Sequence, residues 1–163
     1  MEWVFHELSE QDRIPVVDLF NHYIENTFAA FPEKMVDYSF FDVFRQMTAG
    51  FPAVSVRTTS DVLIGFGFLR PYHILPAFRQ TAEITYFLHP DSIRRQIGTR
   101  LLAHLEDKAR GQGLTSLLAS ISSLNPPSIR FHEKNGFTEC GRFLAIGVKK
   151  GRPFDVIWMQ KRL

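Results

Sequence analysis

The stretch that decides the fold is residues 81–111, which read TAEITYFLHPDSIRRQIGTRLLAHLEDKARG. Residues 82–88 are rich in apolar and aromatic side chains and predict a buried strand. Residues 97–110 predict an amphipathic helix that ends at the glycines which follow. One face of this helix carries Ile97, Leu101, Leu102, Leu105 and Ala109. A strand, a loop and a helix in this order indicate an α/β fold.

The segments on both sides complete the pattern. Upstream, apolar periodicity predicts a strand at 3–8, helices over 14–24 and 38–48, and strands at 51–57 and 62–69. Downstream it predicts a strand at 116–121, a short helix at 128–135, and strands at 139–148 and 154–161. We expect a mixed, mostly antiparallel sheet with helices on both faces. The absence of a linker or repeat predicts a single domain over residues 1–163.

Composition excludes several classes of partner. The chain has 163 residues with 19 Lys+Arg against 17 Asp+Glu, and this balance predicts neither nucleic-acid nor membrane binding. No apolar run approaches the roughly 20 residues that span a bilayer, and the first residues lack the pattern of a signal peptide. The single cysteine, Cys140, excludes an intramolecular disulfide. We expect a cytoplasmic protein, and the spacing of the six histidines predicts no metal site.

Three local features carry possible chemistry. The loop before the central helix holds two arginines and Gly98, and a helix start of this kind suits a phosphate, although an ordinary helix start looks the same. Glu83 lies in an apolar strand, where it faces either solvent or a cleft in which it could act as a general base. His132 lies inside the short helix and has the same two alternatives.

Several separated segments, taken together, resemble the GNAT acetyltransferases, and within them the branch similar to phosphinothricin N-acetyltransferase. The segments are RQTAE at 79–83, YFLHPD at 86–91, NPPSIRFHEKNGF at 125–137, and GVKKGRPFD at 147–155 with WMQ at 158–160. They occur in the same order as in the family, and the resemblance covers nearly the whole chain. It implies the GNAT acyl-CoA N-acyltransferase fold.

The resemblance also implies a cofactor site and a catalytic pair. In the family, the strand before the loop splays away from the next strand, and acetyl-CoA enters the gap with its pyrophosphate on the loop. Glu83 matches the family's base, and His132 is expected to orient the substrate or return a proton to the thiolate. No metal is implied. The expected cofactor-binding residues are Leu88, His89, Pro90, Arg94, Arg95, Gln96, Ile97, Gly98, Thr99 and Asn125.

The branch implies a small primary amine as substrate, such as an amino acid or a phosphinic or sulfoximine analogue of glutamate. Arg79 is a candidate partner for a substrate carboxylate, and Phe31 is a candidate for an apolar substrate wall. The aromatic-rich segment 28–51 could equally pack in the core or in a dimer. The resemblance to this branch, whose members commonly form homodimers, predicts a homodimer.

The chain departs from the family pattern at two places, the loop and residue 78. Ile93 and Gln96 stand where the family carries an arginine or glutamine and its first glycine, and Phe78 replaces a common tyrosine. These changes leave two alternatives open beside a small-molecule acetyltransferase. The first is a GNAT-fold module without catalysis that binds acyl-CoA or another protein, and the second is an acetyltransferase of a protein N-terminus or a polyamine.

Overall fold

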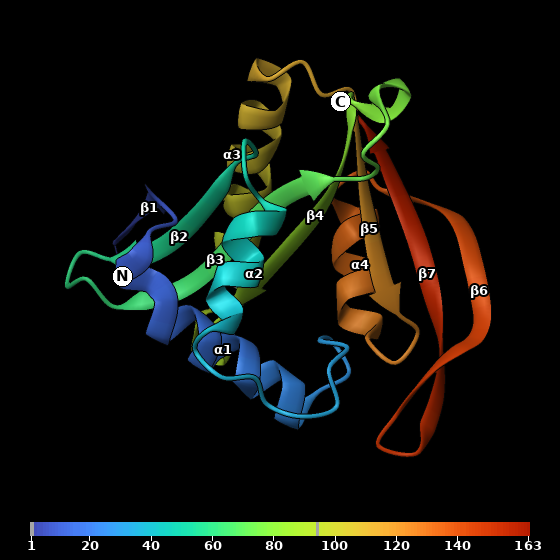
Figure 1. Ribbon diagram of the computed structural model, residues 1–163, viewed down its shortest axis with the longest axis horizontal. Coiled ribbons are helices and arrows are strands. Elements are labelled where there is room, and N and C mark those ends of the chain that lie inside the picture. The colour runs from blue at the N-terminus through green and yellow to red at the C-terminus, as the bar shows by residue number, and fades with distance from the viewer. Residues whose placement is uncertain (1, 94) are drawn as a thin grey trace.

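The computed structural model describes residues 2–93 and 95–163 and contains one seven-stranded sheet in the order β1-β2-β3-β4-β5-β7-β6 (Figure 1). The strands are β1 (Trp3–Glu7), β2 (Ala53–Thr58), β3 (Leu63–Pro71), β4 (Thr81–Leu88), β5 (Ser116–Ser122), β6 (Thr138–Lys149) and β7 (Arg152–Arg162). The helices are α1 (Arg13–Asn26), α2 (Phe40–Met47), α3 (Ile97–Gly111) and α4 (Pro126–Lys134). Short 3-10 turns are η1 (Glu10–Asp12), η2 (Pro76–Phe78) and η3 (Pro90–Ser92).

The sheet is mixed and mostly antiparallel, as predicted. β4 and β5 run parallel, and the other neighbouring strands described pair antiparallel. The predicted order of elements is confirmed, and individual ends shift by a few residues. α4 begins at Pro126, earlier than predicted, because a proline in the first helical turn needs no N–H partner.

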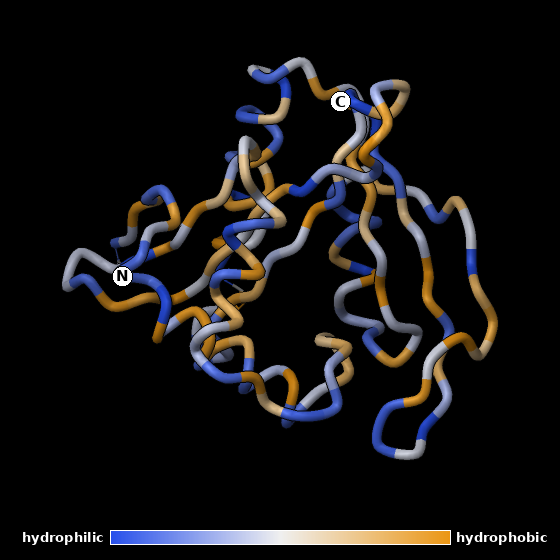
Figure 2. Tube along the Cα trace, in the orientation of Figure 1, coloured by the Kyte–Doolittle hydropathy of each residue, from blue (hydrophilic) through white to orange (hydrophobic). Residues whose placement is uncertain are grey.

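Two apolar cores cover the two faces of the sheet. One lies between the sheet and α1 with α2, and it contains Phe41, Phe44, Phe66 and Phe68. The other lies under α3 and α4 and contains Leu101, Leu105, Leu117 and Ile157. The sheet therefore has helices on both of its faces (Figure 1). In Figure 2 hydrophobic colour follows the inner strands, and the turn between β6 and β7 is hydrophilic.

Glycines in β3 allow α3 to approach the sheet closely. A Cβ atom at Gly67 would lie 3.0 Å from the Cβ of Tyr86 and 3.1 Å from a side-chain carbon of Leu105. A Cβ at Gly65 would lie 2.5 Å from a side-chain carbon of Leu88. Larger residues here would push away Leu88 at the end of β4, so the bare face of β3 fixes where β4 and α3 lie.

A buried ion pair fixes the start of α1 on β2. Asp12 is fully buried, and its Oδ1 accepts hydrogen bonds from Nε and a terminal nitrogen of Arg57 at 3.0 and 2.6 Å. Its Oδ2 accepts the Ser9 N–H at 2.9 Å, which is one of the two reciprocal bonds of a capping box between Ser9 and Asp12. Arg57 also contacts the exposed carboxylate of Asp61 at 3.1 Å. The Asp12 carboxylate thus joins the first helix to an inner strand.

We expect Asp12→Asn to lower the free energy of unfolding by about 3 kcal/mol, because the substitution leaves a buried guanidinium without its charge partner. The matched control is Asp61→Asn, which removes the exposed partner of the same arginine and should cost less than about 1 kcal/mol. Urea denaturation measures both values. Equal losses of unfolding free energy in the two variants would contradict the larger contribution that we assign to the buried Asp12 carboxylate.

None of the helices within the described part of the chain combines the length and the hydrophobicity needed to span a bilayer.

Candidate active site

The site forms where β4 and β5 separate. Their parallel pairing covers only Thr81–Glu83 of β4 and Ser116–Leu118 of β5. Beyond this point, β4 stays paired with β3 as far as Leu88, and β5 stays paired with β7 as far as Ser122. The two strands diverge in Figure 1, with α4 beside β5. One edge of β4 is therefore unpaired from Ile84 onward, and a ligand with amide groups could pair there.

Glu83 is the last β4 residue that pairs with β5, and only 8% of its surface is exposed. Its Oε1 accepts a hydrogen bond from Arg70 at 2.8 Å and another from the Ser120 hydroxyl at 3.2 Å. Arg70 is its cross-strand neighbour in β3, and Ser120 lies on β5 beyond the last paired residue. Of the two sequence-based alternatives, the solvent-facing one is wrong. The carboxylate lies at the vertex of the gap.

At the far end of β4, Leu88 presents its backbone to the gap. The His89 N–H donates to the Ile64 carbonyl of β3 at 2.8 Å, and backbone groups of successive strand residues point to opposite sides. The N–H and carbonyl of Leu88 therefore point away from β3. The Tyr23 hydroxyl of α1 donates to this carbonyl at 2.6 Å. This bond fixes the orientation of the Leu88–His89 peptide group.

The loop after β4 ends at the N-terminus of α3, where backbone N–H groups gather. The N–H of Arg100 donates to the Gln96 carbonyl at 3.0 Å, so those of Ile97, Gly98 and Thr99 precede the first helical bond and point out of the helix end. Such an end binds anions. Arg95 and Thr99 are exposed, whereas Arg94, also predicted to bind the cofactor, lies outside the described residues.

Gln96 adopts a left-handed backbone with φ of 61°. A side chain in this region costs roughly 1 kcal/mol or more compared with glycine. The position is the one at which the sequence departs from the glycine of the GNAT pattern. The local conformation thus suits a glycine although the residue is a glutamine.

His132 is buried, with 3% exposure, and both of its ring nitrogens have partners. Nδ1 bonds to the Ser128 carbonyl at 2.7 Å, and Nε2 bonds to the Tyr86 hydroxyl. Burial lowers the pKa of His132, and the Ser128 bond opposes this shift. Burial raises the pKa of Tyr86 well above its ordinary value, with a contribution from Glu106. The alternative of a solvent-facing histidine is wrong.

Asn125 lies one residue before α4, where β5 has ended. It is the N-cap residue of that helix, but its side chain makes no capping hydrogen bond. Its backbone N–H donates to the Ser122 carbonyl at 2.9 Å. Its half-buried side-chain amide is therefore available on the β5 side of the gap.

The hydrogen bond described for Arg79 and the ring contact described for Phe31 do not reach Glu83 or His132. The exposed Arg79 follows η2, and its guanidinium bonds to the Pro76 carbonyl at 3.3 Å. Phe31 lies in the loop after α1, and its partly exposed ring stacks on Phe154 with 5.7 Å between centroids. Arg70, which the sequence analysis missed, is the arginine that reaches Glu83, and its Nε is buried without a hydrogen-bond partner among the described residues.

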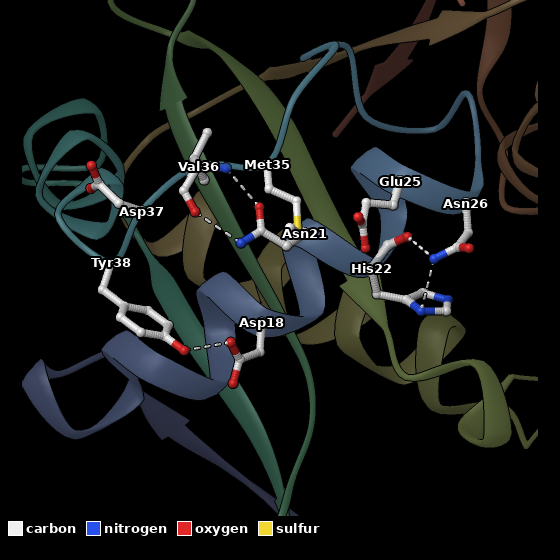
Figure 3. A pocket seen from close by; sticks show the side chains of 9 residues that line it. All are labelled: Asp18, Asn21, His22, Glu25, Asn26, Met35, Val36, Asp37 and Tyr38. Atoms are coloured by element: carbon white, nitrogen blue, oxygen red, sulfur yellow. Dashed lines mark hydrogen bonds between the residues drawn. The ribbon is translucent and has the colours of Figure 1, made fainter.

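An open groove lies between α1 and residues 35–38 (Figure 3). Its polar groups bond to one another: the Asn21 side chain pairs with the N–H and carbonyl of Val36, and the Tyr38 hydroxyl donates to Asp18 at 3.0 Å. None of the hydrogen bonds described for the groove residues reaches Glu83. Across residues 2–93 and 95–163, no group of three His, Cys, Asp or Glu side chains is placed to hold a metal.

Comparison with known proteins identifies the family. Residues 16–137 match the acetyltransferase (GNAT) family. The chain belongs to this family. It is 31% identical over 156 residues to the L-methionine sulfoximine/L-methionine sulfone acetyltransferase of Salmonella typhimurium. The matched region covers 93% of this chain and 90% of that protein.

Solved structures of GNAT proteins share the whole fold. The phosphinothricin acetyltransferase of Sinorhizobium meliloti, in complex with acetyl-CoA, aligns with a TM-score of 0.92 at 25% identity over 100% of this chain and 89% of that one. The ribosomal-protein-alanine N-acetyltransferase of Brucella melitensis aligns with a TM-score of 0.89 at 29% identity over 98% and 99%. The GNAT fold expected from the sequence is therefore confirmed.

The residues present fit acetyl-CoA, the co-substrate of GNAT enzymes. The unpaired edge of β4 can accept a chain of amides, and the start of α3 can accept phosphate. A Cβ at Gly98 would lie 3.3 Å from the Phe131 ring and 3.4 Å from a side-chain carbon of Leu88, so the glycine keeps this part of the helix start close to both neighbours.

We expect Gln96→Gly to tighten acetyl-CoA binding by about two- to tenfold. Glycine adopts the observed backbone without strain and lets the N–H groups approach phosphate more closely. Calorimetric titration of acetyl-CoA measures the change. Gln112→Gly, at the other end of α3, is the matched control and should leave affinity unchanged. Weaker acetyl-CoA binding by Gln96→Gly would show that the glutamine side chain itself contributes to the binding of the cofactor.

Proposed function

We propose that this protein transfers the acetyl group of acetyl-CoA to the primary amine of a small amino acid or amino-acid analogue. The observation that carries the proposal is the position of Glu83. Its carboxylate lies at the vertex of the gap between β4 and β5, held by Arg70 and Ser120. A general base is needed here because an alkylammonium with a pKa near 10 is almost fully protonated at neutral pH.

The cofactor site follows the gap. Acetyl-CoA supplies the acetyl group and the thiol that leaves. We assign its pantetheine arm to the backbone of Leu88, His89 and Pro90. The pyrophosphate is assigned to the loop and helix start from Arg94 to Thr99, with Arg95 and the N–H groups of Ile97 and Gly98 as donors. Asn125 contacts the cofactor from the side of β5.

The proton and the developing charge are handled by different residues of β4. Glu83 accepts, through a water, the proton that the ammonium must lose before its nitrogen can attack. The Leu88 N–H, on the gap side of the strand, donates to the acetyl oxygen as negative charge develops there. Tyr23 keeps this peptide group in place by holding the Leu88 carbonyl.

His132 acts in this scheme by orienting its neighbours. Both ring nitrogens are occupied, by the Ser128 carbonyl and the Tyr86 hydroxyl, and burial lowers the pKa of the ring. The neutral imidazole therefore fixes the Tyr86 side chain on the α4 side of the gap. The thiolate then receives its proton from the attacking nitrogen, which after attack still carries one proton more than the amide product.

The substrate class rests on Arg70 and on the relatives. Arg70 is partly exposed beside Glu83, so a carboxylate could bind there while the amine reaches the base. Arg79 and Phe31 would contact the remainder of the substrate. Methionine sulfoximine and phosphinothricin, the substrates in the relatives' names, both carry an α-amine and a carboxylate. An alanine at a protein N-terminus, the target named for the Brucella protein, lacks the free carboxylate and is the second candidate.

The decisive assay follows thiol release from acetyl-CoA with L-methionine sulfoximine, phosphinothricin, a polyamine and an alanine-ended peptide. We expect turnover with the first two. In Glu83→Gln, turnover should fall by about 100-fold or more, because the amide cannot accept the proton. Acetyl-CoA affinity measured by titration should change by less than about twofold, since the site of proton transfer is apart from the loop.

Glu133→Gln, an exposed change on α4, is the matched control and should behave as the wild type. Equal loss of turnover and of acetyl-CoA affinity in Glu83→Gln would remove the base assignment. Acetyl-CoA binding without turnover of any amine would favour a GNAT module without catalysis.

We also propose that residues 1–163 form one domain. The protein is proposed to be a homodimer and to act in the cytoplasm. One sheet joins β1 near the start to β7 near the end, which supports a single unit. β6 is an edge strand with a hydrophobic stretch on the rim of the molecule (Figure 2). Its exposed apolar side chains are Phe143, Leu144, Ile146 and Val148. An uncovered apolar edge of this length favours association.

We expect Leu144→Glu to convert a dimer into a monomer, because it places a charge in the centre of this stretch, where 75% of the leucine is exposed. Analytical ultracentrifugation gives the mass of each species. The matched control is Val62→Glu near the opposite edge, at an exposed valine, which should leave the dimer intact. A wild-type monomer at high concentration would contradict the dimer.

A further inference from the structure

Lys149 is the last residue of β6. Its side chain is buried, with 1% exposure, and none of its described bonds is to a carboxylate. Its ammonium donates to three backbone carbonyls: Ile24 at 2.8 Å, Thr27 at 2.9 Å and Ala30 at 2.7 Å. An ammonium has three donors, so each one is used. The side chain is therefore a clamp on one short segment of backbone.

The segment is the end of α1 and the loop that follows. Ile24 belongs to the last turn of the helix, Thr27 is its C-cap residue, and Ala30 lies three residues further on. Carbonyls at a helix C-terminus carry partial negative charge and have no partners within the helix. The Lys149 cation satisfies carbonyls of this kind, and it turns the loop back toward the sheet.

Neighbouring residues of the β6–β7 turn contact the same segment. The Lys150 N–H donates to the Glu33 carboxylate at 2.9 Å, and its ammonium donates to the Glu25 carbonyl. The guanidinium of Arg152 lies 5.1 Å from the centre of the Phe28 ring. Separate contacts from one turn thus hold residues 25–33.

A ring of the same hairpin contacts Phe31. The Phe31 ring lies parallel to Phe154 of β7, with 4° between the ring planes. Phe154 in turn lies across β6 at Gly147, where a Cβ would be 2.2 Å from the ring. One face of the Phe31 ring therefore packs on the hairpin of β6 and β7, and the ring remains partly exposed.

The clamped segment is also bonded to the candidate site. The Thr27 N–H and hydroxyl donate to the Tyr23 carbonyl at 3.2 and 2.7 Å. Tyr23 donates its own hydroxyl to the Leu88 carbonyl at 2.6 Å. Two residues thus connect the segment that Lys149 holds to the peptide group at the end of β4.

We propose that Lys149 is a positioning residue for the amine side of the site: it holds the end of α1 and the Phe31 loop so that the substrate amine meets Glu83 and Leu88. The proposal rests on the function proposed above. It assigns Lys149 no contact with substrate or cofactor.

The test is Lys149→Met, which keeps the length and apolar stem of the side chain and removes the three donors. We expect the KM for L-methionine sulfoximine to rise by about tenfold or more. The Kd of acetyl-CoA should stay within about twofold, because the pairing of Leu88 with Gly65 of β3 still holds the cofactor side of the site. Hydrogen exchange of residues 25–33 should become faster, and exchange in α3 should not change. Lys108→Met, an exposed lysine near the end of α3, is the matched control and should change none of these values.

A second variant covers the case in which Lys149→Met fails to fold. Phe154→Leu leaves the ammonium in place and removes the ring under Phe31, so the KM for the amine should rise and the Kd of acetyl-CoA should not. An unchanged amine KM in the folded variants, or an equal loss of acetyl-CoA affinity, would overturn the proposal. Absence of turnover in the wild type would instead contradict the proposed function. In that case hydrogen exchange still tests the role of Lys149: an unchanged exchange rate of residues 25–33 in Lys149→Met would show that the lysine does not hold this segment.

Discussion

The structure depends on the early separation of two parallel strands. β4 and β5 share three paired residues, and then each keeps only its other neighbour. The ladders to β3 and β7 hold the strands apart, so the gap is a property of the whole sheet. It leaves an unpaired backbone edge, and it brings a buried carboxylate from one strand against a hydroxyl from the other at the vertex. The proposed cofactor site and the proposed base therefore both lie along this gap.

Helix α1 closes one side of that gap and is fixed at three points along its length. Asp12 ties its start to Arg57 of β2, Tyr23 ties its last turns to the Leu88 carbonyl, and Lys149 ties the backbone after it to the β6–β7 hairpin. The three bonds use a charge pair, a hydroxyl and an ammonium, and they reach different parts of the sheet. A helix held in this way cannot turn about its axis without breaking buried polar bonds, each of which is costly to leave unmade.

The sequence predicted the elements well because their signals are local. Helical periodicity over 97–110 and the apolar runs of the inner strands depend only on neighbours along the chain. The contacts of the site depend on register. Arg70 follows an apolar strand like any solvent-facing arginine, and only the antiparallel pairing of β3 with β4 brings it to Glu83. Lys149 looks like a turn lysine, and its burial requires residues 24–30, which lie more than a hundred positions away.

The protonation states follow from the same geometry. Because Nδ1 of His132 faces the Ser128 carbonyl, it must carry the proton, and Nε2 must accept from the Tyr86 hydroxyl. Burial lowers the pKa of the histidine and raises that of the tyrosine, so both shifts favour the neutral pair. A proton added to the ring would require the Tyr86 hydroxyl to turn from donor to acceptor, and it becomes favourable only below the ordinary histidine pKa of 6.5. The pair is therefore uncharged at neutral pH, and the Nε2 lone pair is already engaged by the Tyr86 hydroxyl. Among the predicted catalytic residues, Glu83 is the one with a carboxylate to accept the proton of the amine.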